Sequence, residues 1–263
     1  YKNTDKISEA INKAKVQKPV YNVFAHDGSN HKIWIVNNKD QIEQMLSEIN
    51  SMDSLFIADG HHRSAAAARV KEKFSKKNLN HDGNENYNYF LAVAFPHSEM
   101  TILDYNRIIK GLNGQSINSL ISNIEKNYSV KKHSEEFKPV TKNTFGMYID
   151  KNWYELNAIK ENINLNDPVK SLDVSILHDT IIEPLLGIYD ERTDPRIDFV
   201  GGARGLKELE NRVNNDNFDI AFALFPTPIE ALIDVAEANK VMPPKSTWFE
   251  PKLLDGLLSH LIN

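Results

Sequence analysis

One stretch, residues 54–70, constrains the fold most, because it joins a short apolar run to a helix through a tight turn. The run Leu55-Phe56-Ile57 is typical of a buried strand. Asp59-Gly60 then favours a turn, since glycine tolerates backbone angles that other residues resist. Four alanines at 65–68 favour a helix. The sequence therefore predicts a strand, a tight turn and a helix in succession.

The groups at the start of this helix are suited to an anion, most of all a phosphate. A helix N-terminus presents unpaired N–H groups and about half a positive charge. His61, His62 and Arg63 add two imidazoles and a guanidinium, and Gly60 and Ser64 complete the expected phosphate-binding segment. The alternative is a plain corner between strand and helix with surface histidines.

Residues 58–63, Ala-Asp-Gly-His-His-Arg, resemble the hallmark of an uncharacterised family labelled SpoOJ/ParA/ParB/RepB-like. That family is similar to the ParB/sulfiredoxin superfamily, whose members bind nucleotide phosphates at the same corner. A free-serine kinase branch also shows Asp-Gly-His-His-Arg. Residues 242–253 resemble the family's C-terminal signature, and the resemblance extends from about Val20 to Leu257. It implies a ParB/sulfiredoxin-like fold for the first part of the chain.

The resemblance implies a protein that binds a nucleotide or a phosphate, and within that class a phosphotransferase acting on a small hydroxyl compound such as free serine. Such an enzyme needs a phosphate cradle, a divalent cation and a base near the hydroxyl. We take Asp59, His61 and His62 as catalytic candidates, with Asp59 as a ligand of Mg²⁺ or as the base. The expected nucleotide is ATP, ADP or CTP. Those kinases use an additional glutamate upstream of the motif, and its equivalent is not evident here.

A second set of candidates lies near the end of the chain. Lys245, Ser246 and Thr247 offer a cation and two hydroxyls in a loop that two prolines hold extended. This loop could also be a rigid connector, and the family signature favours a phosphate-binding role. We expect it to fold back toward Asp-Gly-His-His-Arg at residues 59–63, which we call the 59–63 motif. The resemblance also adds Arg107 as a further candidate.

Two other functions stay open at this point. A non-catalytic nucleotide-binding switch of the ParB type, which regulates DNA or a partner, would use the same corner. A degenerate corner in a protein that binds only partners would have no nucleotide affinity.

The composition argues against several classes of partner and of functional site. The 263 residues include 31 Lys and Arg against 36 Asp and Glu, a net charge of −5, which argues against a nucleic-acid partner. There is no cysteine, which excludes disulfides, thiolate zinc sites and sulfiredoxin chemistry. No apolar run approaches the ~20 residues of a membrane span, and no signal peptide is visible. We therefore expect a cytoplasmic protein without a membrane partner, and leave its oligomeric state open.

We expect a mixed α+β fold in two units. Residues 1–98 would form a ParB/sulfiredoxin-like, phosphate-binding unit, and residues 99–263 a second α+β unit. Because the chain begins at Tyr1 and the family has a further region before this point, we expect the first unit to lack its N-terminal part.

Apolar patterns predict the remaining elements. A strand at 89–95 should lie beside residues 55–57, buried on both faces. Thr4 should cap a first helix. Other expected helices cover 39–50, 117–124, 172–186, 206–213, 229–236 and 253–262, and other expected strands cover 20–24, 32–36, 128–130, 145–149, 153–156, 197–200 and 218–225.

Two features of the second half favour structural roles. His178 and Glu183 lie on one predicted helix, but their spacing is not the i, i+3 or i, i+4 of a metal-binding pair, so we interpret them as structural. The glycine-rich segment 201–205 precedes a helix and could cradle a phosphate. It lacks the Lys-Ser/Thr ending of a P-loop, so we expect a plain turn.

Overall fold

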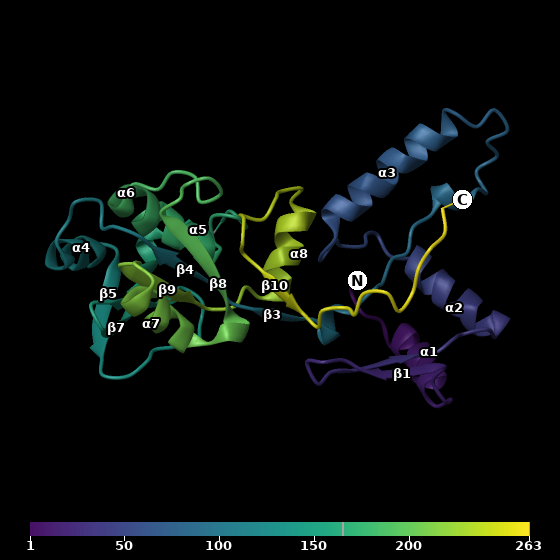
Figure 1. The fold of residues 1–263 in the computed structure, drawn as a ribbon, viewed down its shortest axis with the longest axis horizontal. Helices are drawn as coiled ribbons and strands as arrows, with labels where there is room; N and C mark the ends of the chain where they lie inside the picture. The colour runs from purple at the N-terminus through teal and green to yellow at the C-terminus, as the bar shows by residue number, and fades with distance from the viewer. Residues whose placement is uncertain (165, 263) are drawn as a thin grey trace. The chain divides into compact units, whose positions relative to one another are not determined.

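The computed structural model describes residues 1–164 and 166–262, and it combines helices with antiparallel sheets (Figure 1). The mixed α+β class expected from the sequence is confirmed. Contacts between residues divide the chain into two units. Unit 1 comprises Tyr1–Met100 and Pro251–Asn263, and unit 2 comprises Thr101–Glu250. The ParB/sulfiredoxin-like arrangement expected for the first part of the chain stays a prediction.

Unit 2 is built on an antiparallel sheet of six strands in the order β5-β7-β6-β9-β4-β8. Its strands are β4 (Tyr105–Ile109), β5 (Tyr128–His133), β6 (Thr144–Ile149), β7 (Asn152–Ala158), β8 (Ile197–Gly201) and β9 (Ile220–Leu224). Every residue of β6 and β9, the two central strands of the sheet, is buried. The strands expected in this half of the chain are confirmed.

Helices cover both faces of this sheet. The helical elements of unit 2 are α4 (Ile117–Ile124), η3 (Lys160–Asn162), α5 (Asp173–Leu177), the π-helical η4 (His178–Ile182), α6 (Glu183–Leu186), η5 (Gly202–Arg204), α7 (Leu206–Asn215) and α8 (Ile229–Glu237). Successive strand residues point to opposite faces. Met147 of β6 therefore packs in one core with Leu177 of α5, and the adjacent Tyr148 packs in a second core with Leu209 of α7.

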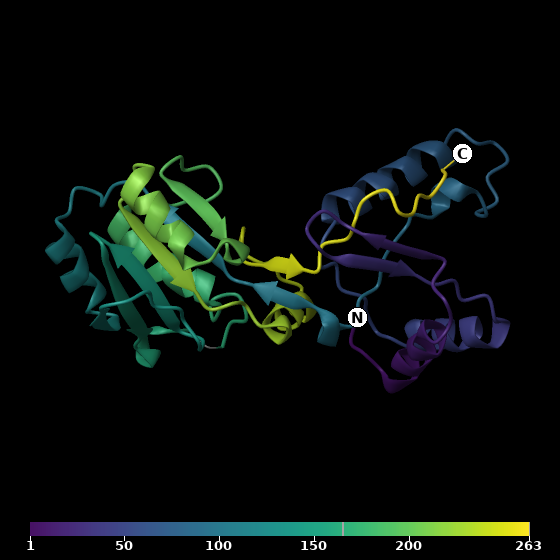
Figure 2. The same ribbon diagram turned by 60° about the horizontal axis from the view of Figure 1, so that its bottom comes forward.

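Two short strands complete unit 2. β3 (Thr101–Leu103) pairs antiparallel with β10 (Trp248–Glu250), and Figure 2 shows them side by side. This pairing joins the two ends of unit 2, so the 242–247 loop is held to the unit from its C-terminal side.

Unit 1 contains the remaining elements, α1 (Asp5–Lys15), β1 (Tyr21–Phe24), β2 (Asn30–Ile33), α2 (Lys39–Asn50), α3 (His61–Ser75), η1 (Asn86–Asn88) and η2 (His97–Glu99). Thr4 caps α1 as predicted, since its side chain accepts a hydrogen bond from the Ile7 N–H. The helix at 39–50 is confirmed. The strands expected at 20–24 and 32–36 pair as an antiparallel hairpin (Figure 2), although the second of them pairs over 30–33.

Three expected elements of unit 1 are wrong. Residues 55–57 and 89–95 form no strand, and residues 253–262 form no helix. Leu55 is 58% exposed, Ile57 62% and Phe90 54%, so the expected burial on both faces is wrong as well. An apolar run becomes a strand only when another strand satisfies its backbone N–H and C=O groups. In the described part of the chain neither run has such a partner.

No helix in the described parts of the chain is both long enough and apolar enough to cross a membrane.

Candidate functional site

The 59–63 motif forms the start of α3, as the sequence predicted. Gly60 caps the helix in the left-handed conformation, with φ of +81°, which a residue without Cβ adopts at little cost. A Cβ at this position would stand 3.1 Å from Nη2 of Arg63. The Arg63 guanidinium therefore lies back against the Gly60 backbone, at the mouth of the helix.

The first turn of α3 has backbone donors without a partner inside the helix. The first hydrogen bond of the helix runs from the Ser64 N–H to the Gly60 carbonyl, at 2.9 Å. The N–H groups of His61, His62 and Arg63 therefore have no partner within the helix, and no side chain caps them. The two imidazole rings lie 4.3 Å apart, and both are exposed. An anion at this point would meet three N–H groups, the helix dipole and a guanidinium.

Asp59 is an exposed, charged carboxylate beside this helix start. Its Oδ1 accepts a hydrogen bond of 2.7 Å from the Gly60 N–H, and its Oδ2 lies 3.6 Å from Nζ of Lys252. The bond from Gly60 and the charges of Lys252 and Arg63 together lower the pKa of Asp59. A general base works best when its pKa lies near the working pH. The environment of Asp59 therefore suits a metal ligand better than a base.

The 245–247 loop holds its side chains mainly within unit 2. Nζ of Lys245 lies 5.5 Å from the centre of the Tyr105 ring, a cation–π contact. Ser246 is buried, and its hydroxyl donates a hydrogen bond of 2.6 Å to the Pro243 carbonyl, which closes the loop on itself. Thr247 is half-buried. The motif belongs to unit 1 and this loop to unit 2, so their expected proximity stays a prediction.

Arg107 lies in the core of unit 2. It is 1% exposed, its Nη2 lies 3.5 Å from Oε2 of Glu191, and its guanidinium stacks over the Phe199 ring at 5.3 Å. Burial lowers the pKa of Arg107, while Glu191 opposes the shift. These contacts describe a buried ion pair that belongs to the packing of the sheet.

The glycine-rich segment 201–205 runs from the last residue of β8 through the short 3-10 helix η5 to Gly205, the cap of α7. A Cβ on Gly202 would lie 2.3 Å from Oδ1 of Asp104, so the Asp104 carboxylate packs directly against this backbone. Asp104 also accepts the Gly202 N–H at its carbonyl, at 2.8 Å. A carboxylate in this position would repel a phosphate, which argues against a phosphate cradle here.

The π-helix brings together residues that the sequence placed apart. A π-turn closes between residues i and i+5, and Nε2 of His178 lies 3.4 Å from Oε2 of Glu183. The interpretation from α-helical spacing was therefore wrong about their separation, and no sequence signal marked the π-turn. With Asp179 they place three metal-ligating atoms within 4.8 Å of one another. Lys170 neutralises Asp179 at 2.7 Å, and Glu191 bonds His178 at 3.1 Å. The group is thus a network of ion pairs.

Several solved structures are similar to this chain, with low sequence identity and low TM-scores. A conserved hypothetical protein from Pyrococcus furiosus is 15% identical with a TM-score of 0.39, and the match covers 81% of this chain and 82% of that one. A free serine kinase in complex with AMP is 13% identical with a TM-score of 0.38, covering 82% and 81%. A mutant free serine kinase in complex with ADP is 17% identical with a TM-score of 0.37, covering 76% and 69%.

No curated protein matches the chain. Residues 1–175, more than half of the chain, match the model of a family described as a protein of unknown function, DUF1015. This match includes the whole of the 59–63 motif. The chain belongs to the DUF1015 family.

Proposed function

We propose that this protein binds the phosphate groups of a nucleotide at the start of α3. The proposal rests on the N-terminus of α3. There the N–H groups of residues 61–63 have no side-chain cap, and Arg63 lies beside Gly60. Free N–H groups, a helix dipole and a guanidinium together form a site that favours negative charge.

We further propose that the bound nucleotide donates a phosphoryl group to a small hydroxyl compound such as free serine. The bond between the terminal phosphorus and its bridging oxygen breaks, a bond to the substrate oxygen forms, and the hydroxyl proton leaves to a base. The resemblance of residues 58–63 to the free-serine kinases supports this substrate class. Within the motif, His61 and His62 are the candidates for the base.

Asp59 is the candidate ligand for a Mg²⁺ ion carried by the nucleotide. Its carboxylate is exposed, and its lowered pKa keeps it charged at neutral pH. Mg²⁺ prefers oxygen ligands and is commonly held by one or two carboxylates together with substrate phosphates. One carboxylate beside a phosphate-binding helix fits that pattern.

Calorimetry with ATP, ADP and CTP, each with Mg²⁺, tests the site. We expect Arg63→Ala to weaken binding about 10- to 100-fold, because a hydrogen bond to a charged group contributes roughly 1.5–3 kcal/mol. Arg69→Ala is the matched control, since Arg69 is also exposed on α3 but lies beyond its first turn. Equal losses in both variants, or no heat with any nucleotide, would contradict the proposal.

Transfer itself has a separate test. Incubation with serine, Mg²⁺ and each nucleotide should yield phosphoserine, detected by mass spectrometry, and Asp59→Asn should abolish it while nucleotide binding without Mg²⁺ persists. Binding without any phosphoserine would favour the non-catalytic switch, which needs only the helix mouth.

A further inference from the structure

One contact in the ion-pair network of unit 2 is close without being a hydrogen bond. Nε2 of His178, the first residue of η4, lies 3.4 Å from Oε2 of Glu183, the first residue of α6. An N–H···O hydrogen bond spans about 2.7–3.2 Å, so this separation is too long for one. The contact is an ion pair only if Nε2 carries a proton.

The other ring nitrogen of His178 is held by Glu191. Its Nδ1 lies 3.1 Å from Oε1 of Glu191, and Oε2 of the same carboxylate lies 3.5 Å from Nη2 of Arg107. Arg107 is 1% exposed and Glu191 9% exposed, so their positions are fixed by the packing of the sheet. A carboxylate accepts hydrogen bonds, which places the proton of a neutral imidazole on Nδ1 and its lone pair on Nε2.

This arrangement is typical of a histidine that binds a metal ion. Such a histidine donates its second ring N–H to a carboxylate, which fixes the orientation of the ring and the nitrogen that binds. In His178 the fixed nitrogen is Nε2, and its lone pair faces a carboxylate oxygen of Glu183. Two electron-pair donors at this distance repel each other unless a positive centre lies between them.

Asp179 supplies a third ligand. One ligand atom from each of His178, Asp179 and Glu183 lies within 4.8 Å of the other two. Zn²⁺ bound at 2.0–2.2 Å by tetrahedral nitrogen and oxygen ligands holds those atoms roughly 3.4 Å apart. The separation of Nε2 and Oε2 is 3.4 Å, and the exposed carboxylate of Asp179 can close the remaining gap by moving its side chain.

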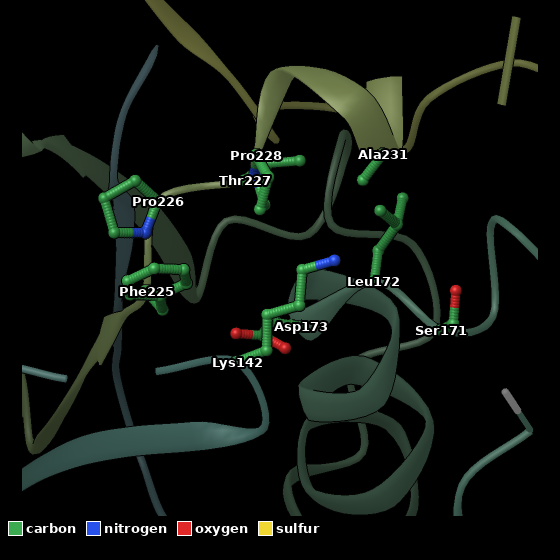
Figure 3. A pocket seen from close by; sticks show the side chains of 9 residues that line it. All are labelled: Lys142, Ser171, Leu172, Asp173, Phe225, Pro226, Thr227, Pro228 and Ala231. Atoms are coloured by element: carbon green, nitrogen blue, oxygen red, sulfur yellow. The ribbon is translucent and has the colours of Figure 1, made fainter. Parts of the chain in front are cut away.

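The cluster borders open space. A hollow of about 350 Å³, open to solvent, is lined by Asp179, Glu183 and Tyr189 among others. A zinc ion with three protein ligands keeps its fourth position for water or another small ligand, and this hollow has room for one. A second hollow of unit 2, beside Asp173, has only about 30 Å³ of free space and holds about one water molecule (Figure 3).

Lys170 is the cation that competes for this cluster. Its Nζ lies 2.7 Å from Oδ2 of Asp179, and 54% of its side chain is exposed. An exposed ion pair contributes little to stability, so the lysine can move into water when a divalent ion binds. Its ammonium group lowers the affinity of the cluster for a cation but does not close it.

We propose that His178, Asp179 and Glu183 bind Zn²⁺, with Glu191 as the positioning residue that holds the imidazole. An imidazole ligand favours Zn²⁺ over Mg²⁺, which prefers oxygen ligands alone. All of these residues belong to unit 2, so the site does not depend on the function proposed for the start of α3.

The test uses zinc alone. The full chain is treated with a chelator, freed of it, and titrated with ZnCl₂ in a calorimeter at neutral pH. We expect a dissociation constant of about 10 μM or lower, and Mg²⁺ at about 1 mM should not displace the zinc.

Variants show whether the zinc lies at this cluster. His178→Ala and Glu183→Gln should each weaken binding at least about 10-fold, the scale found even for residues that only hold a ligand in place. His133→Ala is the matched control, because His133 also contacts a glutamate, Glu155 at 2.8 Å, but belongs to no group of three ligands in the described part of the chain. It should keep wild-type affinity.

Lys170→Met should have the opposite effect. Removal of the competing ammonium group should strengthen zinc binding by up to about 5-fold, the scale of an exposed ion pair. Asp179→Asn should weaken binding, and because Asp179 is exposed this variant tests the site even if the change at His178 unfolds the chain. The NMR spectrum of each variant shows whether it is folded.

Three results would overturn the proposal. The first is that the wild-type chain binds no zinc up to about 100 μM, which would leave a proton as the positive centre on Nε2. The second is that the folded variants at His178, Asp179 and Glu183 keep wild-type affinity, which would place the zinc elsewhere. The third is that Lys170→Met binds zinc more weakly than the wild type.

Discussion

Unit 2 buries its apolar runs, whereas unit 1 leaves comparable runs exposed. Every residue of β6 and β9 is buried, including Phe222 at 0% exposure. In unit 1, residues 89–95 are as apolar as β9, yet they form no strand, and Phe90 is 54% exposed. Among the described residues of unit 1, only Ile7, Ala10 and Pro96 are buried.

The difference teaches that an apolar run is necessary for a buried strand but does not create one. β9 lies between β6 and β4, and both neighbours satisfy its backbone. Helices then cover the two faces of the sheet, with α5 on one and α7 on the other. Residues 89–95 pair with no strand in the described part of the chain. Burial is therefore decided by distant segments.

The strongest test of this comparison truncates one phenylalanine in each unit. Phe222→Ala should destabilise unit 2 by about 3–5 kcal/mol, because it leaves a cavity in a close-packed core. Phe90→Ala should change stability by no more than about 0.5 kcal/mol, as for most exposed side chains. Urea denaturation followed by circular dichroism measures both. A large loss with Phe90→Ala would show that residues 89–95 are buried in solution, and the contrast between the units would fail.

A second test uses the buried carboxylate of unit 2. The pKa of Asp173 is raised from 3.8 to about 6 by burial, which the Asn143 N–H and Lys142 only partly oppose. The folded state therefore binds more protons than the unfolded state, and stability falls as the pH rises from about 4 to about 6. At pH 8 Asp173→Asn should be more stable than the wild type, by at most about 3 kcal/mol.

The extra stability of Asp173→Asn should vanish below about pH 4, where the wild-type carboxyl is protonated in both the folded and the unfolded state. Thermal unfolding of both proteins from pH 4 to pH 8 measures it. Equal stability across this range would contradict a raised pKa of Asp173.

We expect the smallest effect on stability at Glu85 of unit 1. Its ionisation stabilises the fold as the pH rises, whereas that of Asp173 destabilises it. Desolvation opposes ionisation, but the N–H groups of Asp82 and Gly83 and the amide of Asn88 hold the pKa of Glu85 at about 2. Its stabilising effect is present above about pH 4.5 and is lost as the pH falls toward 2. Glu85→Gln should therefore reduce protection of the 78–88 amides from hydrogen exchange at pH 6 but not at pH 2. Equal protection at pH 6 would contradict this role.

Local signals in the sequence were enough to predict several features of the candidate site. The Asp-Gly pair followed by four alanines predicted where α3 begins, because caps and helix propensity act within a few residues. The same logic predicted α1 behind Thr4 and the helix at 39–50. The contact of Asp59 with Lys252 could not be predicted, since these residues are far apart in the chain.

By itself, then, the sequence determined where α1, α2 and α3 begin and that the chain turns at Asp59-Gly60, because these features depend on neighbouring residues. Only the tertiary structure decided that residues 89–94 are exposed, that Arg107 is buried against Glu191, and that Oδ2 of Asp173 has no partner among the described residues. The physical reason is that burial and pairing depend on which distant segments meet, whereas caps and turns depend on the local backbone.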